Sequence, residues 1–213
     1  MTSKGETVYE IIRQRIIDHT YVPSQALVES TLAEELGVSR NTVKKALMQL
    51  VNEKLVDIKA NKSAIVKSLN IEEAVQLLEI RERLEGLIAY NAANVITDDD
   101  LLKIQNNLSE MKEYIEQNKL KEYSLTNDLI HHVIYNACSN KVAIEMIETI
   151  RLQLRRYNRR TILIAGRSYD SLKEHEAIYK ALQSRNPEEA EKAMRNHVAS
   201  VRRVLKENYS FLF

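Results

Sequence analysis

The stretch STLAEELGVSRNTVKKALMQL, residues 30–50, decides the fold of the N-terminal part of the chain. It predicts a short helix over 31–36, a break at Gly37, and a longer helix whose N-cap is Ser39. Two helices joined by a glycine turn form a helix-turn-helix. An amphipathic helix within 8–21 precedes this unit, because its apolar residues recur at the spacing of one helical face.

The segment LVDIKANKSAIVKS, residues 55–68, predicts two short strands joined by a turn at Ala60 and Asn61. Asparagine tolerates the left-handed backbone conformation that such hairpins need. The longer helix contains three basic residues and no acidic one. The same is true of the hairpin from residue 58 onward. A helix-turn-helix followed by a basic hairpin is a winged helix, so residues 1–68 are predicted to bind DNA.

In a winged helix the second helix of the motif enters the major groove, while the hairpin follows the DNA backbone or the minor groove. Arg40 is the candidate for reading a base, because its guanidinium can bond both O6 and N7 of one guanine. The lysines and Thr42 suit phosphates or a single acceptor. The alternative is that the lysines only form a solvated helix face. The predicted DNA-binding residues are Ser39, Arg40, Asn41, Thr42, Lys44, Lys45, Asn61 and Lys62.

The text LVESTLAEELGVSRNTVKKALMQLVNEKLV, residues 27–56, resembles the winged helix of GntR-type bacterial repressors. It differs from the typical family sequence in two places: Asn41 and Thr42 replace Thr-Pro, and Lys44 replaces an arginine. The ammonium group of lysine is a point charge and cannot make the paired hydrogen bonds of a guanidinium. The operator sequence of relatives is therefore not expected to apply to this chain.

The remainder of the chain, residues 70–213, predicts an antiparallel helical bundle, so the whole protein is expected to be mostly α. Only 4 glycines and 2 prolines interrupt 213 residues, and 44% hydrophobic content is enough for a core. About six helices are predicted, over 71–95, 98–117, 120–137, 141–165, 171–185 and 187–208.

The charge and the apolar pattern exclude other classes of protein. A net charge of +1 provides no global attraction to nucleic acid or membrane, so local patches must supply it. No apolar stretch approaches the roughly 20 residues that span a bilayer, and the first ten residues contain no apolar signal core, which predicts a cytoplasmic protein without a membrane partner. The one cysteine, Cys138, is expected to be buried and inert.

The stretch TNDLIHHVIYN, residues 126–136, places polar residues inside an apolar helix. Asp128 and His132 are four positions apart and share one face about 6 Å from each other, while His131 points some 100° away. An unpaired carboxylate among aliphatic side chains would cost several kcal/mol, so Asp128 needs a partner.

Two further histidines are placed to join this pair. His175 and His197 lie 11 residues before and after Asn186, so both reach the same level when their helices fold back. Three imidazoles and a carboxylate suit a divalent metal, zinc or nickel, with manganese or iron also admissible. The alternative is a hydrogen-bonded pair of Asp128 and His132 with two ordinary surface histidines.

The segments NDLIHHVIYNACSN, LKEHEAIYKAL and MRNHV resemble the FCD effector domain of the FadR subgroup. This resemblance implies that Asp128, His132, His175 and His197 are the metal ligands. It also implies that Arg81 faces an effector cavity, although Arg81 is equally placed to be a surface partner of Glu85, four residues later. A small carboxylate effector is expected to bridge the metal and Arg81.

These features predict a transcriptional regulator and not an enzyme. One winged helix reads too few base pairs to be selective, so we expect a homodimer on two-fold-related operator half-sites. A metal-dependent hydrolase is the rival class, but the chain lacks the motifs that such chemistry needs. A third possibility is the same regulator with a purely structural metal.

Overall fold

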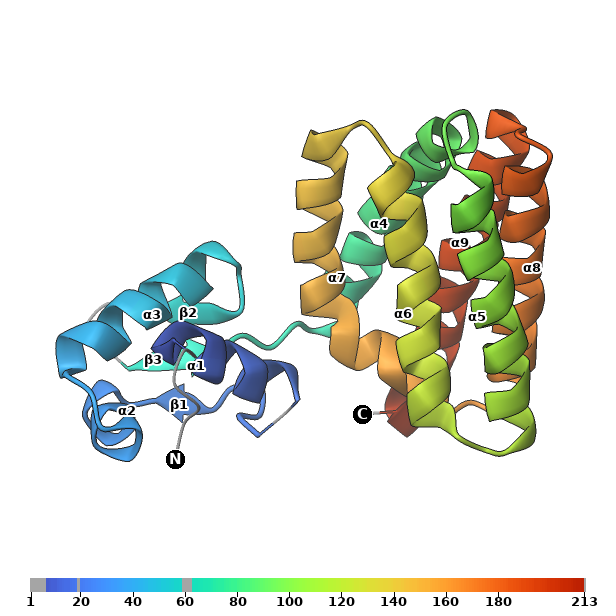
Figure 1. The fold of residues 1–213 in the computed structure, drawn as a ribbon. Helices are drawn as coiled ribbons and strands as arrows, with labels where there is room; N and C mark the ends of the chain where they lie inside the picture. Colours follow the sequence, from blue (N-terminus) through green and yellow to red (C-terminus); the bar gives the residue numbers. More distant parts are fainter. Residues whose placement is uncertain (1–6, 19, 59–62, 213) are drawn as a thin grey trace. The chain divides into compact units, whose positions relative to one another are not determined.

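The structure is a computed structural model that describes residues 7–18, 20–58 and 63–212. The chain divides into two compact units, Met1–Asn70 and Ile71–Phe213 (Figure 1). The first is a winged helix-turn-helix and the second is a bundle of helices, so the predicted mostly α fold is confirmed.

The N-terminal unit combines three helices with a small antiparallel sheet in the strand order β1-β3-β2. Strands β2 and β3 form the predicted hairpin, with Val56 opposite Val66. Strand β1 was not predicted, because two residues carry no recognisable alternation. The elements are α1 (Val8–Ile17), β1 (Ala26–Leu27), α2 (Glu29–Leu36), α3 (Arg40–Asn52), β2 (Val56–Ile58) and β3 (Ala64–Val66).

The predicted break between α2 and α3 occurs at Gly37. This residue has φ +66°, a left-handed conformation that glycine adopts at no steric cost because it has no Cβ. The backbone N–H of Val38 then donates to the carbonyl of Ala33 at 3.0 Å, which closes the end of α2. The turn positions α3 against a core whose members are almost inaccessible to solvent: Ile12, Leu27, Val43, Leu47, Leu50 and Val56.

The second unit consists of six helices among the described residues (Figure 1). They are α4 (Ile71–Ala93), α5 (Asp98–Glu116), α6 (Leu120–Ala137), α7 (Lys141–Thr161), α8 (Arg167–Gln183) and α9 (Pro187–Leu212). Three bounds differ from the prediction by four residues: α7 ends at Thr161, α8 begins at Arg167, directly after Gly166 with φ +79°, and α9 continues through a kink at Asn208 to Leu212. No described helix is long and apolar enough to span a membrane.

The packing order of the bundle differs from the chain order. Short turns predicted that consecutive helices would pack together, and this holds for α5 with α6 and for α8 with α9. The most extensive contact, however, joins the first and last helices, α4 and α9. Gly86 permits this approach, since a Cβ at that position would lie 2.6 Å from Cγ of Arg195. Helices α4, α6, α8 and α9 thereby surround one buried region.

Candidate functional site

The α3 helix presents the predicted DNA-binding residues to solvent. Ser39 caps it, because its Oγ accepts a hydrogen bond from the backbone N–H of Thr42 at 3.1 Å. The buried side of α3 is aliphatic, and the opposite side carries basic and hydrogen-bonding groups. The exposed residues include Arg40, Asn41, Thr42, Lys44 and Lys45. Of the other predicted positions, Asn61 and Lys62 lie outside the described residues.

One residue of this surface was missed by the sequence prediction. Gln49 is exposed and lies one turn beyond Lys45. It lines a surface hollow of about 280 Å³ together with Asn41, Thr42 and Lys45. The four-residue spacing from Lys45 was the available signal, because it places Gln49 on the same helix face.

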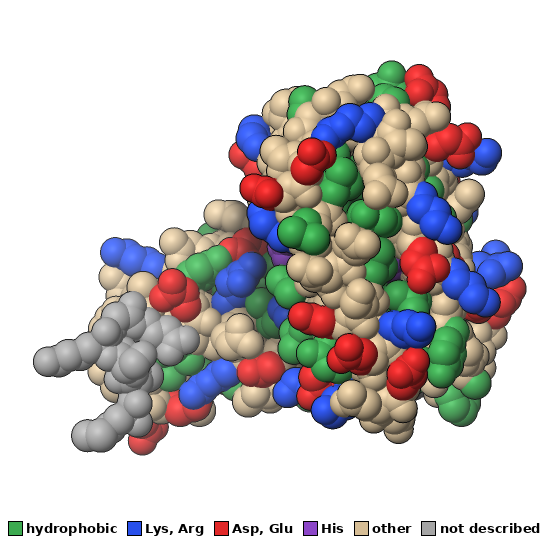
Figure 2. Space-filling model, turned by 45° about the vertical axis from the view of Figure 1, so that its right-hand side comes forward, with side chains coloured by type: hydrophobic (Ala, Val, Ile, Leu, Met, Phe, Trp, Pro, Cys, Tyr) green, Lys and Arg blue, Asp and Glu red, His purple; other side chains and the backbone are tan. Residues whose placement is uncertain are grey.

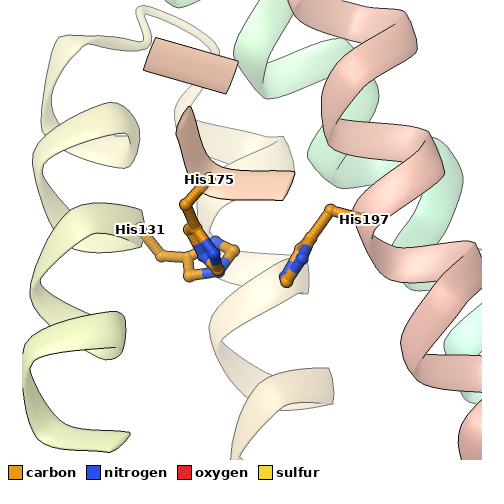
Figure 3. Close-up of side chains that lie close together, drawn as sticks. All are labelled: His131, His175 and His197. Atoms are coloured by element: carbon orange, nitrogen blue, oxygen red, sulfur yellow. The ribbon is translucent and has the colours of Figure 1, made fainter. Parts of the chain in front are cut away.

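Three histidines from three helices meet inside the bundle (Figure 3). His131 lies on α6, His175 on α8 and His197 on α9, and none is more than 2% exposed. The ring centroids of His175 and His197 are 4.3 Å apart, and that of His131 is 5.3 Å from the first and 5.4 Å from the second. One ring nitrogen from each lies within 4.8 Å of the other two. We call these residues the histidine triad.

Each imidazole of the triad has an acceptor beside its Nδ1. Nδ1 of His175 lies 2.7 Å from the backbone carbonyl of Ser171, and Nδ1 of His197 lies 2.8 Å from Oε2 of Glu174. Nδ1 of His131 lies 3.0 Å from Oε2 of Glu85. Carbonyl and carboxylate oxygens only accept hydrogen bonds, so the proton of each neutral ring is expected on Nδ1.

Burial keeps the triad neutral. Desolvation, together with the charge of Arg151, lowers the pKa of His131 to about 4. Desolvation and the two neighbouring rings lower the pKa of His175 well below its usual range. Desolvation, His131 and the charges of Arg167 and Arg81 lower the pKa of His197 well below that range as well. A neutral imidazole with its proton on Nδ1 has a free lone pair on Nε2.

The free lone pairs face one another. Nε2 of His131 and Nε2 of His175 are only 3.3 Å apart, and neither carries a proton to share in this arrangement. Such an arrangement is repulsive unless a cation lies between the rings. Metal-binding histidines show the same pattern, in which the second ring nitrogen donates to a carboxylate or a backbone carbonyl. The residues present therefore fit a divalent transition metal.

Two of the four predicted ligands belong to this cluster, and two do not. His175 and His197 come together as predicted, whereas His132 is exposed to solvent. Asp128 pairs instead with Arg151, whose Nη2 lies 2.6 Å from its Oδ1, and its side chain is 40% exposed. The prediction that Asp128 and His132 face the core is wrong, and His131 occupies the inward position.

The error has a physical cause in helix α6. Leu125 and Leu129 suggested that the face bearing Asp128 and His132 is buried, but they are 44% and 51% exposed. The face that packs into the bundle carries instead residues such as Tyr123, Ile130, His131, Ile134 and Tyr135. The predicted buried face and the observed buried face differ by a rotation of about 100°, which corresponds to one residue along the helix.

Asn127 lies one helical turn before His131, on the same face of α6. Its Oδ1 is buried and has no hydrogen-bond partner among the described residues. A buried oxygen without a partner costs about 1–3 kcal/mol, and an amide oxygen can also accept a hydrogen bond or bind a cation. Asn127 and His131 are four residues apart, as Asp128 and His132 are, but each lies one residue earlier in the chain.

Arg81 is buried beside the triad. It is 3% exposed, its Nε lies 2.5 Å from Oε1 of Glu85, and its Nη1 donates to Asn158 at 3.1 Å. The alternative that Arg81 pairs with Glu85 is therefore correct, although the pair is buried and not on the surface. Burial opposes ionisation of Glu85, but Arg81, His131 and Arg151 outweigh it and hold its pKa well below the usual range.

A second carboxylate, paired with its own arginine, contacts another histidine of the triad. Nη1 and Nη2 of Arg167 donate to the two oxygens of Glu174 at 3.1 and 2.8 Å. Oε2 of Glu174 is also the acceptor for His197. Both carboxylates beside the triad are thus already paired with arginines.

Comparisons with known proteins agree with this division of the chain. The family described as bacterial regulatory proteins, gntR family, matches residues 4–66, and the FCD domain matches residues 76–200. The HTH-type transcriptional repressor RspR of Escherichia coli (strain K12) is 25% identical over 208 residues, which cover 96% of this chain and 91% of the repressor. The HTH-type transcriptional regulator LutR of Bacillus subtilis (strain 168) is 31% identical over 200 residues, covering 82% and 88%.

Among solved structures, E. coli McbR/YncC has a TM-score of 0.79 at 19% identity and covers 98% of this chain and 100% of that one. This likeness supports the fold of the chain. The relatives are transcriptional regulators and not enzymes.

Proposed function

Because the chain belongs to the GntR family of bacterial regulatory proteins and carries an FCD domain, we propose that it is a metal-dependent, ligand-responsive transcriptional repressor. The winged helix binds operator DNA, and the helical unit senses a small molecule. The observation that supports the sensing role most strongly is the histidine triad, in which one ring nitrogen of each residue lies within 4.8 Å of the other two and Nε2 of His131 is 3.3 Å from Nε2 of His175.

Arg40 reads a guanine in the major groove, while Lys44 and Lys45 contact phosphates. Support comes from their exposure on α3 and from the Ser39 cap, which holds the start of that helix rigid. The turn of the wing, with Asn61 and Lys62, is assigned to the backbone or the minor groove on the sequence pattern alone.

The functional unit is a homodimer on two-fold-related half-sites, because one winged helix covers too few base pairs for selectivity. Several large hydrophobic side chains of the helical unit are exposed, and Figure 2 shows hydrophobic side chains at the surface between charged ones. A second copy of the chain would cover part of this apolar area. Sedimentation equilibrium should give the mass of a dimer at micromolar concentration.

The metal is held by His131, His175 and His197, with Oδ1 of Asn127 as a further oxygen donor in place of the carboxylate of Asp128. Zinc and nickel suit imidazole ligands best, and manganese and iron are admissible. When bound, the metal supplies a positive charge and open coordination positions for a ligand. The protein donors named here are neutral, so they leave the charge of a divalent cation uncompensated.

The effector is a small carboxylate. Glu85 and Glu174 are both paired with arginines, so they do not balance the charge of the cation. An anionic ligand would do so. Arg81 remains the proposed second contact for the effector, but the ligand has to compete there with Glu85 and Asn158.

A purely structural metal is the second candidate, and the deep burial of the triad favours it. Operator affinity, measured by fluorescence anisotropy on selected DNA, separates the two. A sensor changes its affinity when candidate organic acids are added, and it loses this response after chelation. If the metal is purely structural, chelation lowers the melting temperature, but no acid changes the affinity for DNA.

The assignment of the site is tested by alanine at His131 and His175, with alanine at the exposed His132 as the matched control. The double variant should lose both bound metal and the acid response, and the control should keep both. Retention of metal by the double variant would refute the triad as the ligand set.

A further inference from the structure

Two chains of charged side chains lead into the histidine triad. In the first, Arg81 and Arg151 face Glu85, and Glu85 faces Nδ1 of His131. In the second, Arg167 holds both oxygens of Glu174, and Glu174 accepts from Nδ1 of His197. The same order, arginine then glutamate then histidine, occurs twice. Each ends on an Nδ1 atom, and in His131 the other ring nitrogen, Nε2, lies 3.3 Å from Nε2 of His175.

The two glutamates have a geometric effect on the rings. A carboxylate beside Nδ1 places the proton there and leaves Nε2 free to donate a lone pair. It also restricts rotation about the bond to the ring, because turning the imidazole over would break the contact. His175 obtains the same restriction from a backbone carbonyl, so all three rings have their Nδ1 engaged.

The arginines have an electrostatic effect. Two bare carboxylates in the interior would carry a large desolvation cost. Arg81 and Arg151 offset it for Glu85, and Arg167 offsets it for Glu174. The carboxylates can therefore orient the rings while adding little net charge to the region.

We infer that Glu85 and Glu174 are positioning residues for the metal, which preset the tautomer and orientation of His131 and His197. This inference rests on the proposed metal site. The contact between Glu174 and His197 carries it furthest, because it is a hydrogen bond of 2.8 Å. Oε2 of Glu85 and Nδ1 of His131 are 3.0 Å apart without hydrogen-bond alignment, and neither atom has a hydrogen-bond partner among the described residues.

The test measures zinc affinity by competition with a chromophoric chelator, using the full-length protein. Glu85→Gln and Glu174→Gln should each weaken zinc binding about 10–100-fold, the usual effect of removing a partner of a metal-bound histidine. The matched control is Glu82→Gln, on the same helix and 8% exposed, whose carboxylate pairs with Arg195 and Arg202 and not with the triad. It should bind zinc like the wild type.

Loss of the buried charge could unfold a glutamine variant, so Glu85→Asp is included. It keeps the negative charge for the arginines but shortens the reach to His131, and it should also lose zinc affinity. The visible spectrum of bound Co²⁺ gives a second readout, since altered ring orientation changes the ligand field. A substitution that only loosened the fold would lower the melting temperature without changing this spectrum.

The outcomes are distinguishable. If the wild type binds no zinc or cobalt, the proposed metal site fails and this inference falls with it. If the wild type binds zinc and the Glu85 and Glu174 variants bind it as tightly as Glu82→Gln, the inference alone is overturned. Weakened binding with altered cobalt spectra in the positioning variants supports it.

Discussion

His131 and His132 are neighbours in the chain but occupy different environments. The first is 1% exposed with a pKa lowered to about 4, and the second is exposed to solvent. The difference follows from the rotation of about 100° between successive residues of a helix. Only the inward residue can contribute a nitrogen to a cluster built by three helices.

Replacement of His131 by alanine should lower zinc affinity by more than about 100-fold, because losing a ligand costs at least as much as losing its hydrogen-bond partner. His132→Ala should leave zinc affinity unchanged. Metal content after dialysis, measured by mass spectrometry, compares the two variants. Equal metal loss from both would contradict the assignment.

Arg40 and Lys44 lie on the same exposed surface but differ in what they can recognise. Arg40→Ala should cost about 1–3 kcal/mol of discrimination at one base pair of the operator. Lys44→Ala should weaken binding to all DNA alike and reduce the slope of log affinity against log salt by about one. Anisotropy titrations at several salt concentrations, on operator and unrelated DNA, measure both effects. The same loss of specificity in both variants would count against a base contact by Arg40.

At the scale of elements, the ends of the helices determine how the functional faces are presented. Gly37 closes α2 in a left-handed conformation, and Ser39 opens α3 with a side-chain cap. In the bundle, Arg151 of α7 reaches Glu85 of α4 and Asp128 of α6. A single arginine thus joins α7 both to the preceding helix, α6, and to α4, which is distant in the sequence.

Substitutions at Ser39 separate the stability of α3 from its contact with DNA. Ser39→Ala should destabilise the N-terminal unit by about 1 kcal/mol, because the N–H of Thr42 loses its side-chain acceptor. Ser39→Asp preserves an acceptor and should retain stability, but its negative charge should weaken DNA binding. Urea denaturation and anisotropy test the two effects. Normal DNA binding by Ser39→Asp would show that the start of α3 does not approach phosphates.

At the scale of the whole molecule, the chain consists of a unit that presents polar groups outward and a unit that buries them. The winged helix uses exposed cations, whose interactions with DNA are screened by salt. The bundle places its functional groups in a dry interior, where neutral histidines and paired carboxylates are the stable forms. The helical unit should therefore be the more sensitive to pH.

The metal-free helical unit should lose stability as the pH falls from about 6.5 toward 4. The unfolded chain protonates its histidines near pH 6.5. In the folded state burial lowers the pKa of His131 to about 4. The unfolded state then binds more protons in this window, so stability decreases by up to about 1.4 kcal/mol per pH unit from this histidine alone. Urea denaturation in the presence of a chelator, at pH 7, 6 and 5, measures the slope.

His131→Gln is the control, because it removes one of the titrating groups. Its stability should decline less steeply over the same pH range, whatever its stability at pH 7. An identical slope for the variant and the wild type would show that His131 is not buried in its neutral form.

The winged helix could be predicted from the sequence because its signals are local. A left-handed glycine, an N-cap serine and an acid-free helix act within a few residues of where they occur. The same holds for the bundle helices, whose bounds agree with the prediction to within a few residues except at the start of α8 and the ends of α7 and α9. Strand β1, by contrast, exists only because β3 offers it a partner.

The sequence by itself determined that His175 and His197 meet, because both lie the same distance from one turn and their helices can only fold back on each other. Only the tertiary structure decided which residue of α6 joins them. The apolar side chains of α6 occur on more than one face, so the packing of α5 and α4 against α6 selected His131 for the interior and left Leu125, Leu129 and His132 outside. Burial depends on what covers a helix, and that information is not contained in the helix itself.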